Sequence, residues 1–181
     1  MALRRSSAYR SVGRAYTRKS RVQIKNYIKA FPASRIVKHV MGDASKFMQK
    51  GFPFVVSLIS KEAVQVRDTA IESARLQIHR ELETALGTDH YFALTVYPHH
   101  VLRENKMLTG AGADRMQTGM SQSFGAPTNL AVQLKPGKRI FVVAVNNPEE
   151  VITARNILDG IRSKIPVHVY IEVKPIKEFS F

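Results

Sequence analysis

The chain has 181 residues, a formal net charge of +14 at pH 7, a hydrophobic fraction of 44% and no cysteine. This length accommodates one domain with a substantial core. The absence of cysteine excludes a disulfide framework and a thiolate metal site, and it fits a reducing compartment. No apolar run in the sequence approaches the roughly 20 residues that a membrane-spanning helix needs.

The positive charge is concentrated at the N-terminus. Residues 1–42 hold eleven Arg or Lys and no Asp or Glu, whereas the remaining 139 residues hold 17 basic and 14 acidic side chains. A segment with this charge repels itself and favours a polyanionic partner, above all nucleic acid. An Arg-rich, acid-free start is also typical of a mitochondrial transit peptide.

Part of this N-terminal arm has the spacing of a basic helix face. Six cations lie three or four residues apart, which would align them on one side of a helix. They are Arg10, Arg14, Arg18, Arg21, Lys25 and Lys29. An extended tail is the alternative, because Gly13 weakens the helix. We expect an arm that becomes ordered only on its partner.

Beyond the arm, the hydrophobic pattern predicts strands and helices. Residues 54–59 predict a buried strand. The segment 61–86 predicts a long helix with Ser60 as its N-cap, because its apolar residues recur with helical period. Alternation over residues 91–97 predicts a second strand, which ends before Pro98.

The C-terminal part contains clear turn and capping signals. Residues 129–145 predict a hairpin whose turn, Lys135-Pro136-Gly137-Lys138, has the Pro and Gly of a type II turn. Asn147, followed by Pro and two Glu, predicts a helix start, and Ile165-Pro166 predicts its end. Alternation over residues 167–173 predicts a last strand. The elements together predict an α+β two-layer sandwich, with two main helices packed on a mixed, largely antiparallel sheet.

No periodicity extends through residues 105–128, which carry four glycines. A structureless stretch of this length inside a compact domain is generally functional or disordered. Its Gly110-Ala111-Gly112 start suggests a phosphate cradle, but the spacing matches neither the dinucleotide fingerprint nor the phosphate loop. We favour a long Gly-rich loop that reaches a nucleic-acid surface, and a flexible hairpin tip is the alternative.

Candidate groups for metal binding and catalysis are sparse. Zinc needs three or four convergent ligands. His90 stands apart from the pair His99-His100, whose adjacent side chains would point in different directions. Asp114 has no His or second carboxylate near it in sequence, so no catalytic constellation forms. We expect no metal, no cofactor and no enzymatic activity.

Cations beside the loop and the turn could extend the basic surface of the arm. Any one of them is ordinary solvated charge by itself, but the charge pattern of the whole chain favours a shared face. The candidate RNA-binding residues are Arg4, Arg5, Arg10, Arg14, Arg18, Lys19, Arg21, Lys25, Arg103, Lys106, Lys135, Lys138 and Arg139.

Three motifs resemble those of a known family. AGADRMQTGM (residues 111–120) resembles the signature loop of the archaeal and eukaryotic form of the universal large-subunit ribosomal protein L16 family, called L10e in archaea. LKPGKRIFVV (residues 134–143) resembles the Pro-Gly hairpin of that family, and AYTRK (residues 15–19) resembles its archaeal-type start. The resemblance covers residues 9 to 174, is weak over residues 19–42, and argues against a cleaved leader.

The resemblance implies a hammerhead-like strand arrangement and a place in a cleft of the large subunit of the cytoplasmic ribosome. The implied partners are large-subunit rRNA, 5S rRNA or its neighbourhood, A-site tRNA and neighbouring ribosomal proteins, with no membrane and no homo-oligomer. The implied tRNA-facing residues are Gly110, Ala111, Gly112, Ala113, Asp114, Arg115, Met116, Gln117, Thr118, Gly119 and Met120. Asp114 and Gln117 stand where the bacterial tip is basic, which makes phosphate neutralisation at the tip less secure.

We therefore expect three parts: a basic rRNA-binding arm (residues 1–42), a globular α+β domain (residues 43–174) with the extended loop 105–128, and a C-terminal tail (residues 175–181). The expected function is that of a structural constituent of the large subunit. Two alternatives remain: an RNA-acting enzyme that uses Asp114 with His99 or His100, and a non-ribosomal RNA-binding assembly factor.

Overall fold

The computed structural model describes residues 4–13, 15–17, 28, 30–105, 110 and 125–179. The strands are β1 (Val40–Gly42), β2 (Phe54–Ser60), β3 (Val64–Arg67), β4 (Tyr91–Leu94), β5 (His100–Glu104), β6 (Ala126–Leu134), β7 (Arg139–Val145) and β8 (Val169–Pro175). The α-helices are α1 (Ala44–Met48), α2 (Asp68–Leu86) and α4 (Pro148–Gly160), and the 3-10 helices are η1 (Ser6–Tyr9), η2 (Ile161–Ser163) and η3 (Ile176–Glu178).

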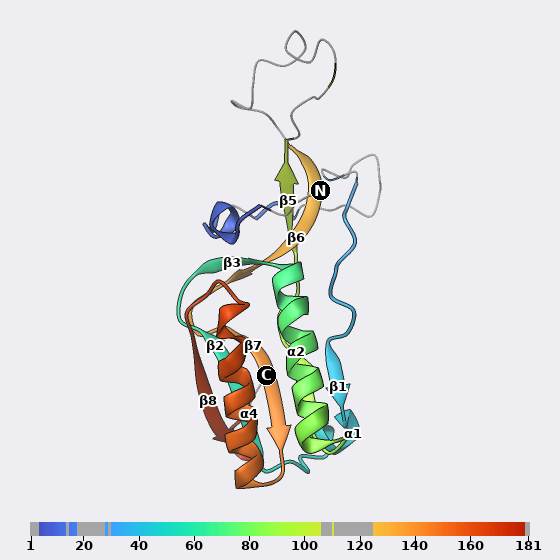
Figure 1. Ribbon diagram of the computed structural model, residues 1–181, viewed down its shortest axis with the longest axis vertical. Helices are drawn as coiled ribbons and strands as arrows, with labels where there is room; N and C mark the ends of the chain where they lie inside the picture. The colour runs from blue at the N-terminus through green and yellow to red at the C-terminus, as the bar shows by residue number, and fades with distance from the viewer. Residues whose placement is uncertain are drawn as a thin grey trace.

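The strands form two antiparallel sheets. The larger sheet has the order β1-β4-β7-β2-β8, and the smaller has the order β3-β6-β5. Helices α2 and α4 lie side by side on one face of the larger sheet, while β5 and β6 extend beyond the end of α2 (Figure 1). The predicted α+β class, with two main helices on antiparallel strands, is confirmed.

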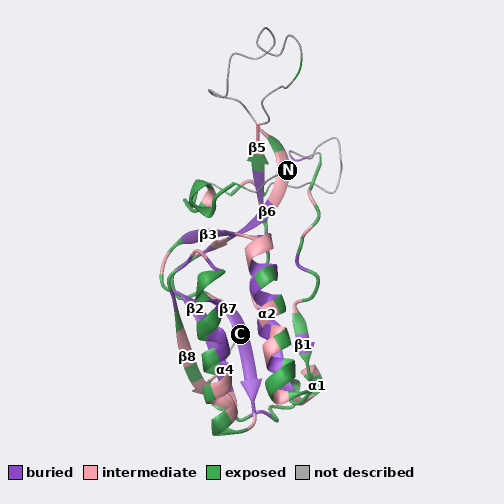
Figure 2. Cartoon of the chain, in the orientation of Figure 1, coloured by how far each residue is buried: buried purple, intermediate pink, exposed green. Residues whose placement is uncertain are grey.

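The main core lies between these two helices and the larger sheet. The inward side of each helix and strand β7 are buried, whereas the outer side of each helix is exposed (Figure 2). Leu58, Ile78, Leu82, Phe141 and Leu158 have no exposed surface. Burial of each such side chain contributes about 1.5–3 kcal/mol to the stability of the fold. The same cluster includes residues of both sheets, so it holds the two sheets together.

A second apolar layer covers the opposite face of the larger sheet. Phe47 from α1 stacks on Tyr91 with ring centroids 3.9 Å apart, and Phe52 is fully buried beside them. Phe179, which follows η3, meets the Phe47 ring edge-on at 6.3 Å. Because both faces are covered, β2 and β7 are nearly continuous runs of buried residues, as expected for such strands.

Several predicted elements are confirmed. The strand over residues 54–59 is β2, and the last strand is β8. Helix α4 begins as predicted: the Asn147 backbone N–H donates to the Glu150 carboxylate at 3.2 Å in a capping box. It ends at Gly160, before the predicted stop at Ile165-Pro166. Among the described residues, no helix is long and apolar enough to span a membrane.

The predicted helix over residues 61–86 is wrong at its start. Residues 64–67 form β3, and α2 begins at Asp68. Val64 and Val66 are buried because β3 pairs with β6, so strand alternation prevails there over the helical period that begins at Ile71. Ser60 caps no helix, and its hydroxyl donates to the Glu62 carbonyl at 2.7 Å.

The predicted hairpin over residues 129–145 is also wrong, although its turn forms. Lys138 N–H donates to Lys135 O at 3.1 Å, and Gly137 has φ +77°, as a type II turn requires. However, β6 pairs with β3 and β5, whereas β7 pairs with β2 and β4. The turn therefore carries the chain from one sheet to the other. Strands β1, β3 and β5 were not predicted, and β4 ends at Leu94 rather than Tyr97.

Candidate nucleic-acid interface

The N-terminal segment crosses the smaller sheet from edge to edge. Arg10 O accepts from Gln65 N–H at 3.0 Å on edge strand β3, and Gly13 O accepts from Gln133 Nε2 at 3.2 Å on central strand β6. Tyr16 O then accepts from Val101 N–H at 3.1 Å on edge strand β5. We call residues 9–13 and 15–17 the strap. It is ordered against the body, so the expectation that the arm orders only on its partner is wrong for these residues.

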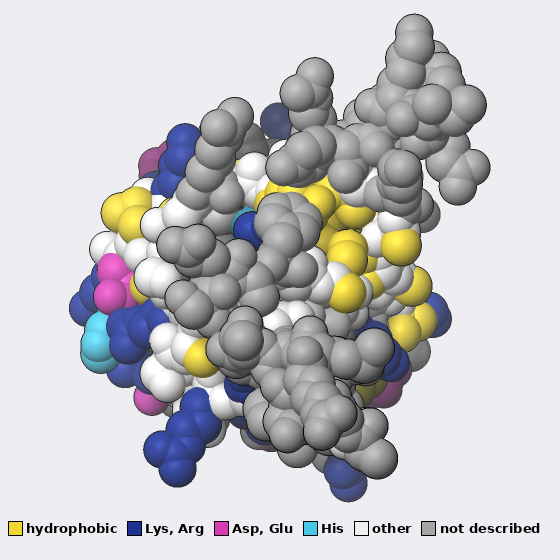
Figure 3. Space-filling view, turned by 90° about the horizontal axis from the view of Figure 1, so that it is seen from above, with side chains coloured by type: hydrophobic (Ala, Val, Ile, Leu, Met, Phe, Trp, Pro, Cys, Tyr) yellow, Lys and Arg dark blue, Asp and Glu magenta, His cyan; other side chains and the backbone are white. Residues whose placement is uncertain are grey.

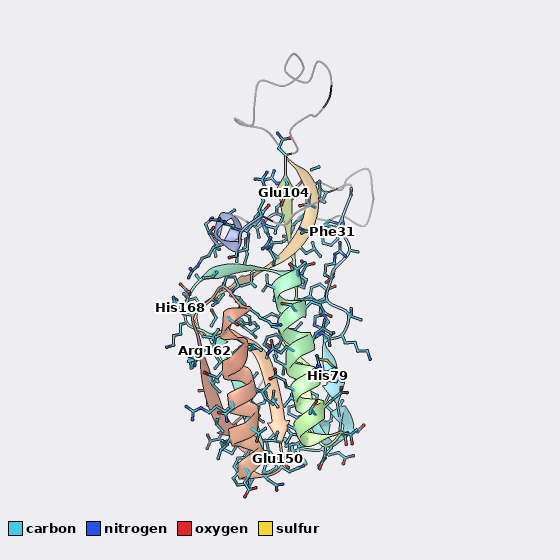
Figure 4. All side chains as sticks on the ribbon, viewed as in Figure 1. Phe31, His79, Glu104, Glu150, Arg162 and His168 are labelled. Carbon is cyan, nitrogen blue, oxygen red and sulfur yellow. The ribbon has the colours of Figure 1, made fainter. Side chains whose placement is uncertain are left out.

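Tyr9 anchors one end of the strap. Its hydroxyl donates to the carboxylate of Glu104, which lies near the outer end of β5 (Figure 4). Burial and this hydrogen bond raise the pKa of Tyr9 to about 12, so the hydroxyl remains a donor at neutral pH. The Arg67 guanidinium lies 5.5 Å from the Tyr9 ring and donates to Arg4 O at 2.8 Å.

Tyr16 anchors the other end. Its N–H donates to His100 Nδ1 at 2.8 Å, and the Arg103 guanidinium lies 4.6 Å from its ring. Burial, and secondarily the charge of Arg103, lower the pKa of His100, which keeps the imidazole neutral with Nδ1 as an acceptor. Ile28, only 1% exposed, packs with Tyr16 against two apolar residues of the sheet. These contacts hold the strap by its backbone and rings.

The strap contacts leave cationic side chains on the surface. Arg4 and Arg5 are exposed beside η1, where their backbone carbonyls, not their guanidinium groups, make the described hydrogen bonds. Arg10 is also exposed and forms an ion pair with Glu62 at 2.7 Å. Arg10 is thus partly neutralised within the chain, and Arg4 and Arg5 are the stronger candidates for phosphate contact.

A second group of candidate cations lies at the turn between β6 and β7. Lys135 and Lys138 are exposed there. Arg139 is half-buried, with its guanidinium 4.7 Å from the Phe179 ring. Lys138 and Arg139 also line a groove of about 530 Å³ whose floor includes Tyr91. On the face seen from above, Lys and Arg side chains lie around the rim of the described surface (Figure 3). The described candidates therefore form two groups, one beside the strap, which includes Arg103, and one at this turn.

The remaining candidates lie outside the described residues. These are Arg14, Arg18, Lys19, Arg21, Lys25, Lys106 and the loop residues 111–120, together with most of the predicted helix face. Gly110 is described and exposed, with φ +141°. At the base of the loop, a Cβ on Gly125 would lie 2.6 Å from the carbonyl carbon of Glu104. Glycine therefore fits best at position 125, where the start of β6 lies against the end of β5.

The histidines do not form a metal site in the described part of the chain, which has no group of three potential His, Cys or carboxylate ligands. His99 and His100 diverge as expected: His99 lies 4.9 Å from the Tyr97 ring, whereas His100 binds the strap. His90 is 1% exposed, and burial lowers its pKa. The predicted catalytic candidate Asp114 lies outside the described residues.

Sequence reasoning missed the body residues that bind the strap. Gln65 and Gln133 face each other across β3 and β6, and the Gln133 amide donates both to Gln65 Oε1 at 3.1 Å and to Gly13 O. Arg67 was likewise not a candidate. No local pattern marks these polar residues, since they come together only through the pairing of β6 with β3, a strand that was not predicted.

A basic segment fixed across a compact α+β body, with cationic side chains left on the surface, is the arrangement of a structural RNA-binding protein. Residues 13–172 match the model of the family described as Ribosomal protein L16p/L10e. The chain therefore belongs to this ribosomal protein family, which is not a family of enzymes.

Curated archaeal relatives support this assignment, and each is named "Large ribosomal subunit protein uL16". The relative from Hyperthermus butylicus is 40% identical over 97% of this chain and 91% of its own length. The relative from Methanococcus maripaludis is 39% identical over 98% of both chains. The relative from Metallosphaera sedula is 40% identical, also over 98% of both. The suspected family resemblance is confirmed over nearly the whole chain.

Proposed function

We propose that the protein is a structural constituent of the large ribosomal subunit, where it binds rRNA through two groups of cations. The observation that carries this proposal is the N-terminal segment: the strap is fixed to both edges of the smaller sheet, and Arg4 and Arg5, which precede it, are exposed. A pre-ordered cationic segment loses less conformational entropy on binding than a free tail. Lys135 and Lys138 supply the second group and form no ion pair among the described residues.

We also propose that the loop over residues 110–120 faces A-site tRNA, and that the body lies near 5S rRNA and neighbouring ribosomal proteins. Strands β5 and β6 support the first point, because they project beyond the helices and carry this loop at their outer end (Figure 1). Deleting residues 111–119 should leave rRNA binding intact and slow tRNA accommodation. Normal elongation by ribosomes that carry the deletion would contradict this assignment.

The rRNA proposal is tested by the salt dependence of binding. Each phosphate contact contributes about 0.7–0.9 to the slope of log K against log salt concentration. Replacing Arg4 and Arg5 with Gln should lower this slope by up to twice that amount. The control, Arg80→Gln with Arg155→Gln, changes the same charge on exposed helix residues and should have a smaller effect. If deletion of residues 1–17 left the slope unchanged, rRNA anchoring by the strap would be refuted.

Retention on the subunit separates a ribosomal constituent from an assembly factor. A constituent sediments with mature large subunits through a high-salt gradient, because its many phosphate contacts act together. A factor leaves the subunit under the same conditions. Loss of the wild-type chain from mature subunits would therefore contradict the proposed function.

A further inference from the structure

A small cavity lies where three distant segments of the chain meet. It has a volume of about 140 Å³ and is formed by η1, the junction of β3 with α2, and the residues that follow α4. Four of its lining residues have side chains that carry hydrogen-bond donors, namely Ser6, Ser163, Arg67 and Lys164, and Ser6, Ser163 and Lys164 are exposed at its mouth. None of these four residues was a candidate from the sequence.

The chemistry of this cavity is that of an anion site. No carboxylate lines it. Neither Arg67 nor Lys164 forms an ion pair in the described part of the chain, and neither serine hydroxyl has a recorded hydrogen bond there. Two cations and two free hydroxyl donors around one space favour an oxyanion, since charge-assisted hydrogen bonds to oxyanions are the strong ones.

The acids around the cavity already have partners within the chain. Asp68 begins α2, but its carboxylate is buried and accepts hydrogen bonds from the backbone N–H groups of Arg35 and Thr69. Asp159 forms an ion pair with Arg162 at 2.6 Å, and Arg162 lies at the end of α4 (Figure 4).

Glu104 accepts from the hydroxyl of Tyr9, which lines the cavity. Glu81 accepts from the Gln77 amide at 2.7 Å and lines a separate pocket that Lys164 also borders. None of these acids lines the cavity itself, so no carboxylate within it neutralises its positive charge.

We propose that this cavity binds one phosphate group of the rRNA backbone and so clamps the N-terminal segment to the body. This inference rests on the proposed rRNA binding and assigns to it a site built from residues outside the two cation groups above. A space of 140 Å³ is several times the roughly 30 Å³ of a water molecule and suits one phosphate. Exposed Arg4 and Arg5 continue the positive charge beyond it, where the neighbouring phosphates of an RNA backbone would lie.

The location of the cavity couples phosphate binding to strap docking. Ser6 belongs to the N-terminal segment, whereas Ser163 and Lys164 belong to the C-terminal half of the chain. Arg67 is held in place from the same side, because it donates to Arg4 O and lies against the Tyr9 ring. A ligand that binds only the docked arrangement stabilises that arrangement. RNA should therefore tighten the strap on β3.

The test uses the full-length chain and in vitro transcribed large-subunit rRNA. Lys164→Gln removes one cation of the cavity, and Ser163→Ala removes one hydroxyl donor without changing the charge. Lys61→Gln is the matched control, because Lys61 is exposed and its side chain makes no described contact. We expect Lys164→Gln to lower the salt slope by about 0.7–0.9. We also expect Ser163→Ala to weaken binding several-fold, with Lys61→Gln close to wild type.

The outcomes separate the cavity from the general proposal. If the wild type binds rRNA with a steep slope but Lys164→Gln and Ser163→Ala match Lys61→Gln, the cavity assignment is overturned while rRNA binding stands. If the wild type shows no salt slope, the proposed function itself fails. If both variants bind rRNA normally yet fail to enter subunits, the cavity takes an acidic segment of a neighbouring protein, and the phosphate proposal is wrong.

Two further measurements identify the source of the phosphate and test the coupling. A titration with inorganic phosphate, followed by amide chemical shifts, should perturb the cavity only at millimolar concentration. Tight binding of inorganic phosphate without an effect of Lys164→Gln on rRNA affinity would assign the site to a free anion. Hydrogen exchange at the Gln65 amide, which bonds Arg10 O, should slow when rRNA binds the wild type and slow less in Lys164→Gln. Equal slowing in both proteins would refute the coupling.

Discussion

Acidification should release the strap from β5 through a single histidine. His100 Nδ1 accepts the Tyr16 N–H at 2.8 Å, and a proton on that nitrogen would remove the acceptor. Burial and Arg103 lower the pKa of His100 in the docked state. The docked state therefore binds fewer protons than the released state. Docking is at full strength above the ordinary histidine pKa of about 6.5 and weakens as the pH falls below it.

The size of the effect follows from proton linkage. If the released state titrates with a pKa of about 6.5 and the docked state takes up no proton, lowering the pH from 7.5 to 5.5 costs the docked state about 1.4 kcal/mol. This corresponds to a tenfold rise in the population of the released strap. Proton uptake by docked His100 within this range would reduce the effect, so tenfold is the upper limit.

Hydrogen exchange at the Val101 amide measures this equilibrium directly, because that N–H bonds Tyr16 O and is exposed when the strap leaves. We expect its protection, corrected for intrinsic exchange, to fall by up to tenfold between pH 7.5 and 5.5. The control is His100→Asn, whose side chain accepts the same hydrogen bond and does not titrate. The same loss of protection in His100→Asn, or unchanged protection in the wild type, would refute the argument.

Three substitutions test other parts of the fold by urea unfolding. Gly42→Ala should destabilise the protein by several kcal/mol, because Gly42 has φ +76° and a Cβ there would lie 2.0 Å from His90 O; a change below 1 kcal/mol would contradict this. Gly125→Ala should lower the free energy of unfolding by about 1–3 kcal/mol, because its Cβ would clash with the backbone at the end of β5. An unchanged urea midpoint would show that β5 and β6 can move apart at this point without cost. Arg75→Ala should cost about 3–5 kcal/mol, since it leaves Glu72 buried without the partner that binds it at 2.6 and 2.8 Å; wild-type stability would exclude a buried charge at Glu72.

The elements that the sequence predicted correctly depend on neighbouring residues. The start of α4 is set by Asn147 and Glu150 within one turn, and the turn before β7 is set by Gly137. The sheets to which β6 and β7 belong depend on partners far along the chain. For that reason the turn was predicted correctly and the hairpin was not.

The residues of the candidate interface also fall into those that the sequence could indicate and those that only the fold brings together. Net charge indicated nucleic acid as the class of partner, and cations such as Arg4 and Lys135 could be named as candidates from the sequence. The strap depends on Gln65, Gln133 and His100, which converge only when the smaller sheet has formed. The cavity beside η1 joins both ends of the chain, and no local pattern could have indicated it.

The strap also imposes an order on biosynthesis. Tyr16 is made early, but the smaller sheet on which it docks is complete only at Leu134, the end of β6. At about 5–20 residues per second, the strap waits roughly 6–24 s for that sheet. During this interval the strand edges that the strap covers, at Gln65 of β3 and Val101 of β5, are unpaired in the nascent chain. Unfinished chains therefore present open strand edges that finished chains cover, and synthesis of β6 is the step that completes the docking surface of the strap.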